Sequence, residues 1–372
     1  MAVTKRGEVS SGFPAAAAAV RRLVLPVACA LSVAGCASTA ATGTHQASSG
    51  GVKPAATANA PTPTPPSLPP AGTIAATYTG LGGVSGQGDT EGIGVDASSV
   101  WIYDGATGVL TRLARDSGAV QATVKLSPSC GDGIGCGNLA IGDGAVWLAN
   151  TVAGTVTRVD PATNKVVATI TVGPARSGAQ VYTTPGAVWS ANYFTDTYTR
   201  IDPRTNRITA TLTQHSRPEA VASAGGSVWL CDSGGDPALT RIDSNTNAVQ
   251  AQIDLTTAQR SSVFCLDAVP LGASVYAVTD GNPSPPQMID TATGKAAEVA
   301  SPPGTELVER GVATGADGGW VIDAQQGLFR LDPHTGAPVA QLAISGAVGV
   351  ADDGHSVWVI TGAGTLYRVT PA

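Results

Sequence analysis

The chain has 372 residues, a formal net charge of −6, and charged side chains at only 13% of its positions. Its 46 Gly and 25 Pro residues suit a fold of short strands and tight turns. No run of Lys or Arg occurs between Thr73 and Ala372, which argues against a surface for nucleic acid or another polyanion.

The N-terminal segment is typical of an exported protein. Arg21 and Arg22 precede the apolar stretch Leu23–Ala34, which is too short to span a bilayer as a mature helix. This stretch runs into the sequence VAGC, which ends at Cys36 and resembles the lipobox of bacterial lipoproteins. The resemblance implies that residues 1–35 are a signal peptide. It also implies that a lipid on Cys36 holds the protein at the extracytoplasmic face of the cell membrane. The alternative is an ordinary signal peptide with an incidental cysteine.

Residues 36–71 predict a tether. They include most of the sequence TANAPTPTPPSLPPAG and carry one charged residue, Lys53. A segment rich in Pro, Thr, Ala and Ser cannot bury a core and stays partly extended. At about 5 to 6 Å times the square root of its length, it would hold a folded domain roughly 30 Å from the lipid.

From Thr73 onward the sequence repeats one pattern. Its fullest copy, Leu139–Gly173, reads as four short strands separated by turn signals at GDG, TVAG and PATN. A period of about 40 to 45 residues with four strands in each repeat is typical of β-propeller blades. One aromatic residue anchors each copy: Trp101, Trp147, Trp189, Trp229, Tyr276, Trp320 and Trp358. The sequence therefore predicts an all-β fold, a seven-bladed β-propeller of four-stranded blades over residues 72–372.

The last copy ends at Ala372 after only three strands. A candidate for its fourth strand is Thr73–Gly82, TIAATYTGLG, which matches the fourth strand of the second copy. We therefore expect this N-terminal strand to pair with the C-terminal blade and to close the ring. Closure would remove an open sheet edge that otherwise invites aggregation.

Three residue types recur around the turn between the third and fourth strands. An Arg lies across the hairpin from each Trp, where its guanidinium is expected over the indole: Arg112, Arg158, Arg200, Arg241, Arg330 and Arg368. An Asp that can cap turn N–H groups ends the third strand: Asp160, Asp202, Asp243, Asp290 and Asp332. A Gly or Asn follows where a left-handed backbone is needed: Gly118, Asn164, Asn206, Asn247, Gly294 and Gly336. Because they repeat in nearly every blade, we interpret these residues as structural.

Four cysteines lie outside the signal and lipobox. In an exported protein an even set most simply forms disulfides. Cys130 and Cys136 flank a short Gly-rich loop, whereas Cys231 and Cys265 are expected on the same rim of adjacent blades. We predict the pairs Cys130–Cys136 and Cys231–Cys265. A zinc site is the competing interpretation.

Polar residues recur where the second strand of a blade ends and the first begins, on what we call the top face. The first group is Asp104, Asn150, Asn192, Asp232 and Asp323, and the second is Glu91, Asn138 and Asp267. Together they predict a ligand-binding funnel around the axis, with oxygen ligands suited to calcium or a polar small molecule. The alternative is that Asp and Asn simply begin polar turns.

Catalytic signals are confined to one loop. His215 in TQHSRPEA has Glu219 nearby, and a histidine beside a carboxylate can act as a general base. An ordinary loop histidine is the alternative.

The sequence VWLANTVAGTVTRVDPATNKVVATITVG resembles the YVTN-type β-propeller repeat and, more distantly, the NHL repeat and the virginiamycin B lyase family. The lyase resemblance would imply a magnesium ion, a histidine pair and a glutamate on the top face, where this sequence offers His215. A resemblance to calcium-dependent six-bladed lactonases would imply Glu, Asn and Asp ligands, for which Glu91, Asn192 and Asp232 are candidates. The fold hosts many functions, so it does not select among them.

We therefore predict a monomeric, lipid-anchored extracytoplasmic propeller that binds a ligand or a protein without catalysis and needs no cofactor. The alternative is a metal-dependent lyase or lactonase-type hydrolase, with calcium or magnesium in the top-face funnel. A scaffold in envelope assembly is a third possibility.

Overall fold

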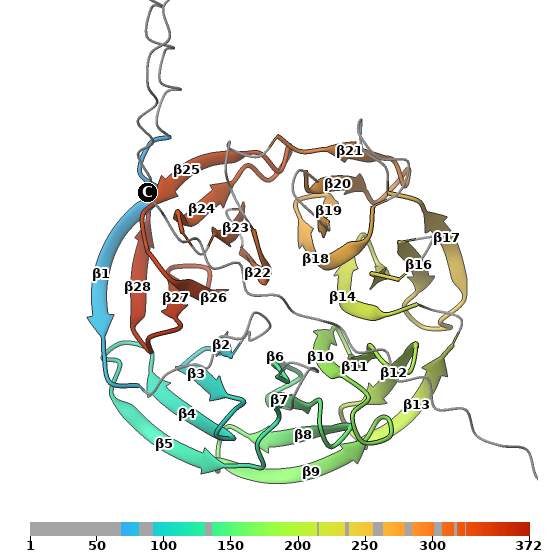
Figure 1. Cartoon of the computed structure of the whole chain (residues 1–372), viewed down its shortest axis with the longest axis horizontal. Coiled ribbons are helices and arrows are strands. Elements are labelled where there is room, and N and C mark those ends of the chain that lie inside the picture. The colour runs from blue at the N-terminus through green and yellow to red at the C-terminus, as the bar shows by residue number, and fades with distance from the viewer. Residues whose placement is uncertain are drawn as a thin grey trace, which may run out of the picture. The chain divides into compact units, whose positions relative to one another are not determined.

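The computed structural model describes residues 68–81, 92–130, 136–213, 216–234, 238–255, 263–279, 285–300, 307–315, 318–323 and 325–372. Within these ranges all regular structure is β-strand, arranged as seven four-stranded antiparallel sheets around a central axis (Figure 1). This confirms the predicted seven-bladed β-propeller. The same residues contain no helix with the length and apolarity needed to cross a membrane.

The strands of a blade follow chain order from the axis outward. Blade 1 comprises β2 (Ile93–Val95), β3 (Ser99–Asp104), β4 (Val109–Ala114) and β5 (Val120–Lys125). Blade 2 comprises β6 (Leu139–Gly142), β7 (Ala145–Asn150), β8 (Thr155–Asp160) and β9 (Lys165–Thr171). Blade 3 comprises β10 (Ala179–Thr184), β11 (Ala187–Asn192), β12 (Thr197–Asp202) and β13 (Arg207–Leu212). Blade 4 comprises β14 (Pro218–Ala224), β15 (Ser227–Asp232), β16 (Leu239–Asp243) and β17 (Val249–Ile253).

The remaining blades follow the same plan until the last. Blade 5 comprises β18 (Cys265–Leu271), β19 (Ser274–Thr279), β20 (Gln287–Asp290) and β21 (Ala296–Glu298). Blade 6 comprises β22 (Leu307–Gly315), β23 (Gly318–Asp323), β24 (Gly327–Leu331) and β25 (Pro338–Leu342). Blade 7 comprises β26 (Ala347–Asp352), β27 (Val357–Thr361) and β28 (Leu366–Pro371), with β1 (Gly72–Tyr78) as its outermost strand.

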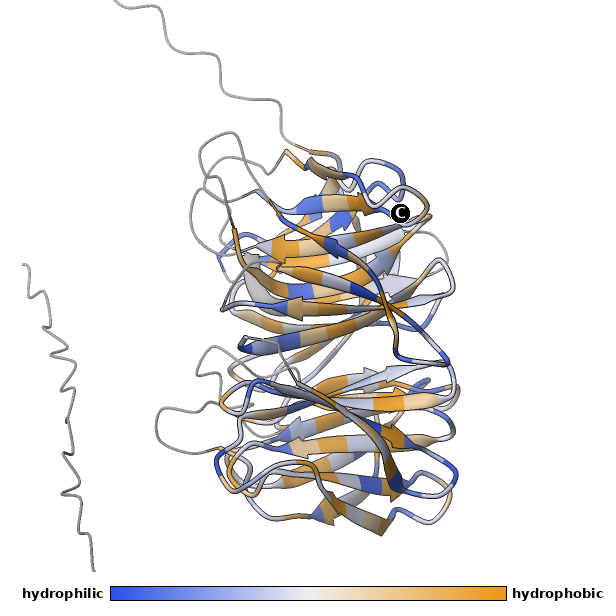
Figure 2. Cartoon of the chain, turned by 90° about the vertical axis from the view of Figure 1, so that its right-hand side faces the viewer, coloured by the Kyte–Doolittle hydropathy of each residue, from blue (hydrophilic) through white to orange (hydrophobic). Residues whose placement is uncertain are grey.

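Burial decreases from the second strand of a blade to the fourth. Every residue of β7, β11, β15 and β23 is buried, because neighbouring blades cover both faces of these strands. The outermost strands β5, β9, β13 and β17 are mostly exposed. Figure 2 shows the apolar positions lying mainly along the strands of the stacked blades.

The hydrophobic core is divided among the seams between blades. Each anchor aromatic shares a cluster with residues of the following blade, as Trp147 does with Val181 and Trp358 with Val100. The other five clusters follow this rule around the ring. All seven anchors are at most 3% exposed. Among the described residues, therefore, no blade has a core of its own, and each depends on its neighbours.

A repeated arginine joins neighbouring blades. Each predicted Arg lies over its Trp, with the guanidinium carbon 5.2 to 5.9 Å from the ring centroid. This confirms the expected stacking. The structure adds a second partner in the next blade: Arg158 Nη1 donates to Pro203 O at 2.6 Å and to Asn206 Oδ1 at 3.0 Å. We call such contacts Arg latches, and Arg112, Arg200, Arg241 and Arg330 form them as well.

Blade 5 departs from this pattern. Its anchor is Tyr276, and Met288 lies opposite it where the other blades have arginine. Met288 reaches the turn of blade 6, because a Cβ built on Gly336 would lie 2.8 Å from Met288 Cγ. The seam between blades 5 and 6 is therefore closed by apolar packing at the position of the latch.

The predicted turn chemistry is confirmed. The Gly and Asn residues named for the turn between the third and fourth strands have φ between 56° and 71°. Each preceding Asp accepts N–H groups of its own turn, as Asp160 Oδ1 does from Ala162 N at 2.9 Å. These backbone hydrogen bonds, joined by Thr hydroxyls, lower the pKa of all five carboxyls, the Thr293 hydroxyl contributing most at Asp290.

Both ends of the repeat region meet in blade 7. β1 pairs antiparallel with β28, from Gly72 opposite Pro371 to Tyr78 opposite Leu366. Residues 69–71, which the sequence assigned to the tether, continue onto blade 6. Gln341 N donates to Pro69 O and Ala71 N donates to Gln341 O, each at 2.9 Å, and Ala71 is fully buried. The packed part of the chain thus begins before Gly72.

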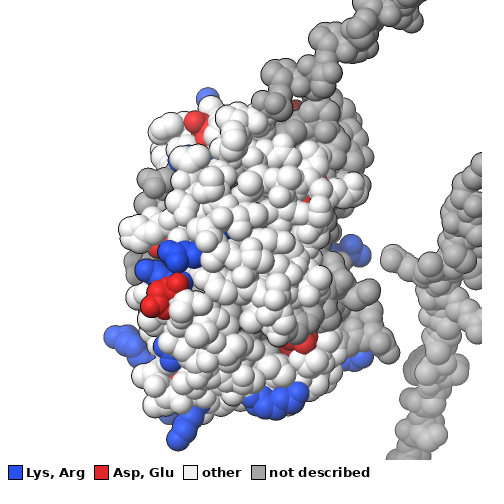
Figure 3. All heavy atoms as spheres, turned by 90° about the vertical axis from the view of Figure 1, so that its left-hand side faces the viewer, with Lys and Arg blue, Asp and Glu red and all other residues white. Residues whose placement is uncertain are grey.

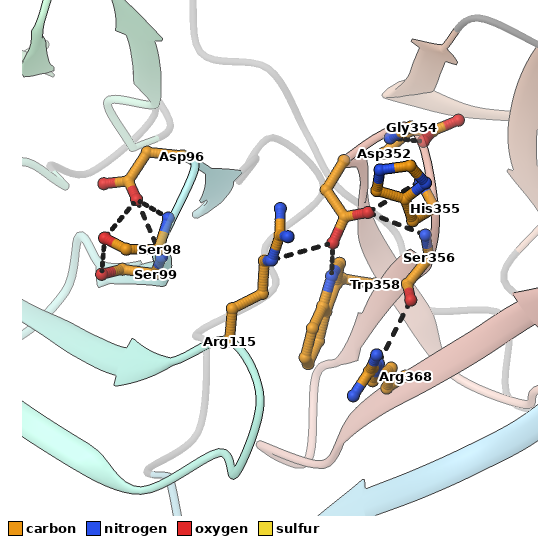
Figure 4. A network of polar contacts seen from close by, with 11 residues as sticks. Asp96, Ser98, Ser99, Arg115, Asp352, Gly354, His355, Ser356, Trp358 and Arg368 are labelled. Carbon is orange, nitrogen blue, oxygen red and sulfur yellow. Dashed lines mark hydrogen bonds and ion pairs between the residues drawn. The ribbon is translucent and has the colours of Figure 1, made fainter.

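The seam between blades 7 and 1 also carries a polar contact (Figure 4). Arg115 Nε lies 3.7 Å from Asp353 Oδ2, and the same carboxylate accepts the indole N–H of Trp358 at 2.9 Å. Burial opposes ionisation of Asp353, but hydrogen bonds from Trp358 and the adjoining turn lower its pKa overall. Asp96 accepts the Trp101 indole N–H at 2.7 Å in the same manner.

Candidate functional site

Three of the predicted funnel residues are engaged in their own turns. Asp104 Oδ1 accepts Ala106 N at 3.0 Å, Asn150 Oδ1 accepts Ala153 N at 2.8 Å, and Asp323 Oδ1 accepts Gln326 N at 2.6 Å. Each residue ends the second strand of its blade, where a short polar side chain can satisfy the N–H groups of the turn. These hydrogen bonds match the polar-turn alternative for these positions.

Asn192 and Asn138 are both buried and hydrogen-bonded. Asn192 Nδ2 donates to the hydroxyls of Thr197 at 3.1 Å and Thr199 at 3.2 Å. Asn138 bridges two blades, because its Nδ2 donates to Val181 O at 3.0 Å and its Oδ1 accepts Val181 N at 2.7 Å. Both amides therefore have structural partners.

A cavity of about 380 Å³ lies along the axis of the ring. Its lining residues come from the innermost strands β6, β10, β14, β18 and β22, and from the adjoining turns. Of the predicted site residues, Asn138 and Asp267 line it, together with the polar side chains of Tyr182, Thr183 and Ser223. The cavity includes two residues of the predicted funnel, and its size falls within the range of small-molecule sites.

Two other predicted acids gather beneath the top face of blades 3 and 4. Glu219 and Asp232 are 9% and 3% exposed, and Glu219 Oε1 accepts the Ser233 hydroxyl at 2.7 Å. The Tyr198 hydroxyl donates to Asp232 Oδ1 at 3.3 Å and also to Cys231 O. Burial raises the pKa of Tyr198 well above its usual value, and the charges of Asp232 and Glu219 raise it further. We call Tyr198, Glu219, Asp232 and Ser233 the buried acid group.

The disulfides flank this region. Cys231 is bonded to Cys265, which confirms the predicted link between blades 4 and 5, with Cα atoms 5.3 Å apart. The structure also bonds Cys130 to Cys136 across the loop that leads into blade 2. Both pairs lie on the top-face side of the propeller, so the covalent links stiffen the rim that carries the predicted site.

One surface group was missed by the sequence reasoning. Tyr193 and Phe194, in the turn after β11, form an edge-to-face pair with ring centroids 4.8 Å apart. The guanidinium carbon of Arg217 lies 5.9 Å from the Tyr193 ring centroid. Phe194 is 50% exposed, and every other large apolar side chain that is exposed in the described residues lies on an outermost strand. We call Tyr193, Phe194 and Arg217 the blade 3 patch. The available signal was an aromatic pair that no other repeat has at this turn.

Charges are sparse on the side of the ring where β1 and β5 lie, and scattered Lys and Arg residues are more in view there than acids (Figure 3).

Three predicted residues, Glu91, His215 and Cys36, lie outside the described residues. Among those described, no group of three or more His, Cys, Asp or Glu side chains is arranged to hold a metal ion.

The chain was compared with known proteins. No protein-family model matches the sequence, and no curated protein matches it. Similar solved structures include selenomethionine-substituted virginiamycin B lyase from Staphylococcus aureus, with a TM-score of 0.61 and 17% identity, covering 76% of this chain and 96% of that one. A catalytically inactive variant of that enzyme with quinupristin has a TM-score of 0.60 and 16% identity, covering 77% and 97%. A streptogramin B lyase has a TM-score of 0.60 and 15% identity, covering 80% and 98%. At such identities the likeness is one of fold.

Proposed function

We propose that this protein is an extracytoplasmic binding module, held at the cell membrane by a lipid on Cys36, that takes up a polar small molecule in its axial cavity. The axial cavity carries this proposal, because it combines a volume of about 380 Å³ with polar side chains from neighbouring blades. Among its lining residues, Asn138 is held by hydrogen bonds to the backbone of Val181 in the next blade. Such a residue fixes the shape of a site before any ligand arrives.

A fragment screen tests the binding proposal. A library of polar small molecules would be screened against the propeller by ligand-observed NMR, and hits would be measured again with Ser223→Trp and Asp267→Asn. Ser223 and Asp267 line the cavity, so a bulky ring or a lost carboxylate should weaken the hits. Val249→Ala, on the outermost strand β17, is the matched control. The proposal would be rejected if the hits bound both cavity variants with unchanged affinity, or if the screen gave no hits.

The anchor has its own test. In a bacterial host that processes lipoproteins, the full chain should enter the membrane fraction and incorporate a fatty-acid label. Cys36→Ser should abolish the label and release the propeller into the soluble fraction. Equal labelling of both chains would show that Cys36 is not the lipid attachment site.

A second candidate function is lyase or hydrolase chemistry near the buried acid group. Two observations favour it: the fold neighbours are lyases, and Glu219 and Asp232 are buried beside Tyr198. Buried ionisable groups in contact are frequent at catalytic sites. Quinupristin would be incubated with the propeller in calcium, magnesium or EDTA, and its loss followed by chromatography. Turnover that Glu219→Gln abolishes would support this candidate, and an unchanged compound would count against a streptogramin substrate.

A further inference from the structure

The blade 3 patch differs from the rest of the propeller in its backbone as well as its side chains. Seven non-glycine residues in the described ranges have positive φ. Asp143, Asn164, Asn206 and Asn247 lie in turns on the face opposite the patch. The other three, Arg176, Asp196 and Arg217, are all in the top-face loops around the patch, with φ of 64°, 54° and 51°. Arginine in this conformation is strained, and such strain is concentrated at functional sites.

These loops hold the patch in one arrangement. Phe194 N donates to Ser177 O at 2.9 Å, and Arg217 N donates to Asp196 Oδ1 at 2.9 Å. Gly178 has φ of 70°, and a Cβ there would lie 2.8 Å from Phe194 Cδ2, so the ring packs closely on bare backbone. Phe194 is therefore exposed beside a half-buried Tyr193 on a fixed support, which reduces the entropy lost when a partner binds.

Arg217 supplies the charge of the patch. Its side chain is exposed and stacks on Tyr193, and among the described residues no carboxylate lies within ion-pair distance of its guanidinium. Arg176, one residue before Ser177, is also exposed. A guanidinium stacked on an aromatic ring presents its N–H donors in the plane that a carboxylate prefers.

We propose that the blade 3 patch is a second binding site, separate from the axial cavity, for a peptide terminus with an aromatic ring beside a free carboxylate. The ring packs against Phe194 and Tyr193, and the carboxylate pairs with Arg217. The apolar surface and the cation are adjacent, so a ligand needs both groups within one residue of each other. A C-terminal aromatic residue meets that requirement.

The test compares two peptides. N-acetyl-glycyl-phenylalanine has the free carboxylate, and its C-terminal amide lacks only that charge. Dissociation constants come from NMR titration of the full propeller. We expect the acid to bind about five- to tenfold more tightly than the amide. Phe194→Ala should weaken both peptides about three- to tenfold, through loss of ring stacking.

Variants of Arg217 separate binding from folding. Arg217→Gln should weaken the acid to the level of the amide and leave the amide unchanged. Arg217→Gly should do the same while raising the melting temperature, because glycine relieves the positive φ. Arg204→Gln, a change in a side chain that is 89% exposed on another turn, is the control and should alter neither peptide.

Four outcomes would overturn the proposal. The first is equal affinity of acid and amide for the unaltered propeller, and the second is unchanged acid affinity in Arg217→Gln. The third is no measurable binding of either peptide. Acid binding that Ser223→Trp removes, but that the patch variants retain, would assign the peptide to the cavity and also reject the patch. Failure of the fragment screen leaves this site unaffected, because its residues do not line the cavity.

Discussion

Arg158 contributes to stability in two ways at one seam. Its guanidinium stacks on Trp147 of its own blade and donates to Pro203 O and Asn206 Oδ1 of the next. Because Trp147 is fully buried, the cation lies on a ring face that water does not cover. A latch of this kind combines a cation–π contact with charge-assisted hydrogen bonds, so one residue type can serve five of the seven seams.

Replacing Arg158 tests its contribution to stability. Arg158→Ala should lower the free energy of unfolding by about 2 to 4 kcal/mol, since it removes both contacts and leaves two acceptors unpaired. Urea denaturation followed by tryptophan fluorescence measures the change. Arg204→Ala, at a side chain that is 89% exposed, should change stability by less than about 0.5 kcal/mol. Similar losses in the two variants would contradict a role for the latch.

The five turn-capping aspartates predict acid sensitivity. Their pKa values are lowered in the folded state, because the carboxylates accept turn N–H groups and Thr hydroxyls. A lowered folded pKa gives stability that is complete above the unfolded pKa and is lost as pH falls through the folded value. The melting temperature should therefore be flat from pH 7 to about pH 5 and fall below about pH 4. Asp243→Asn keeps a capping oxygen without the charge, so the melting temperature of this variant should fall less steeply with acid. Parallel melting curves for the variant and the unaltered protein would show that Asp243 does not contribute to the acid sensitivity.

At the scale of elements, the outer hairpins at three seams share an Arg–Asn pair. The Arg241 latch onto Thr291 O lacks the Asn, and the seam between blades 5 and 6 has apolar packing instead. Where an Arg reaches the next blade's turn from blades 1, 2 and 3, the turn carries an Asn that accepts from it. Where Met288 replaces the Arg, the turn of blade 6 carries Gly336, a position at which any Cβ would crowd Met288. At the seam between blades 5 and 6, the residue types at positions 288 and 336 therefore depend on each other, and a change at one should require a change at the other.

A double-mutant cycle at this seam measures the match. Gly336→Asn alone should lower the free energy of unfolding by about 1 to 3 kcal/mol, because the new side chain crowds Met288. Met288→Arg alone should also lower it, because buried apolar contact is lost. Together the introduced Arg and Asn can form the missing latch. The free energy of unfolding of the double variant should therefore be about 0.5 to 3 kcal/mol higher than the two single effects predict when they are added. Thermal unfolding of the four proteins gives the coupling energy. Strict additivity would show that the two positions do not interact.

At the scale of the whole molecule, the ring depends on a strand from its far end. β1 supplies the outermost strand of blade 7, and Ala372 O accepts from Arg330 of blade 6 at 2.7 Å. Without β1, the edge of β28 would lose its hydrogen-bonding partner and become a template for another chain.

Truncation separates the contribution of the residues before Leu68 from that of the closing strand. A chain that begins at residue 68 should unfold at the same temperature as the full chain. A chain that begins at residue 80 should melt lower and form soluble aggregates, because β28 then has an open edge. Light scattering and calorimetry on the two truncations measure both effects. An equally stable, monomeric shorter chain would show that β1 is dispensable.

The repeat made most of the fold predictable, because period, anchor aromatic, Arg and turn residue each carry a local physical requirement. The seven blades, the stacking of Arg112 on Trp101 and the left-handed turn at Asn164 all follow from single repeats. The reach of the same Arg into the next blade did not, because it depends on how blades pack side by side. The site was less predictable still. Asn192 is a buried amide bonded to Thr197 and Thr199, and Phe194 deviates from the repeated sequence.

The pairing of β1 with β28 also sets the order in which the protein can be completed. Synthesis makes β1 near the start of the propeller and its partner last, so the early strand waits while all the other strands emerge. The final step must then join two segments separated by nearly the whole propeller, which is the slowest class of contact for a chain to find. The interval before that encounter is when the chain is most exposed to proteolysis and to pairing with other copies of itself.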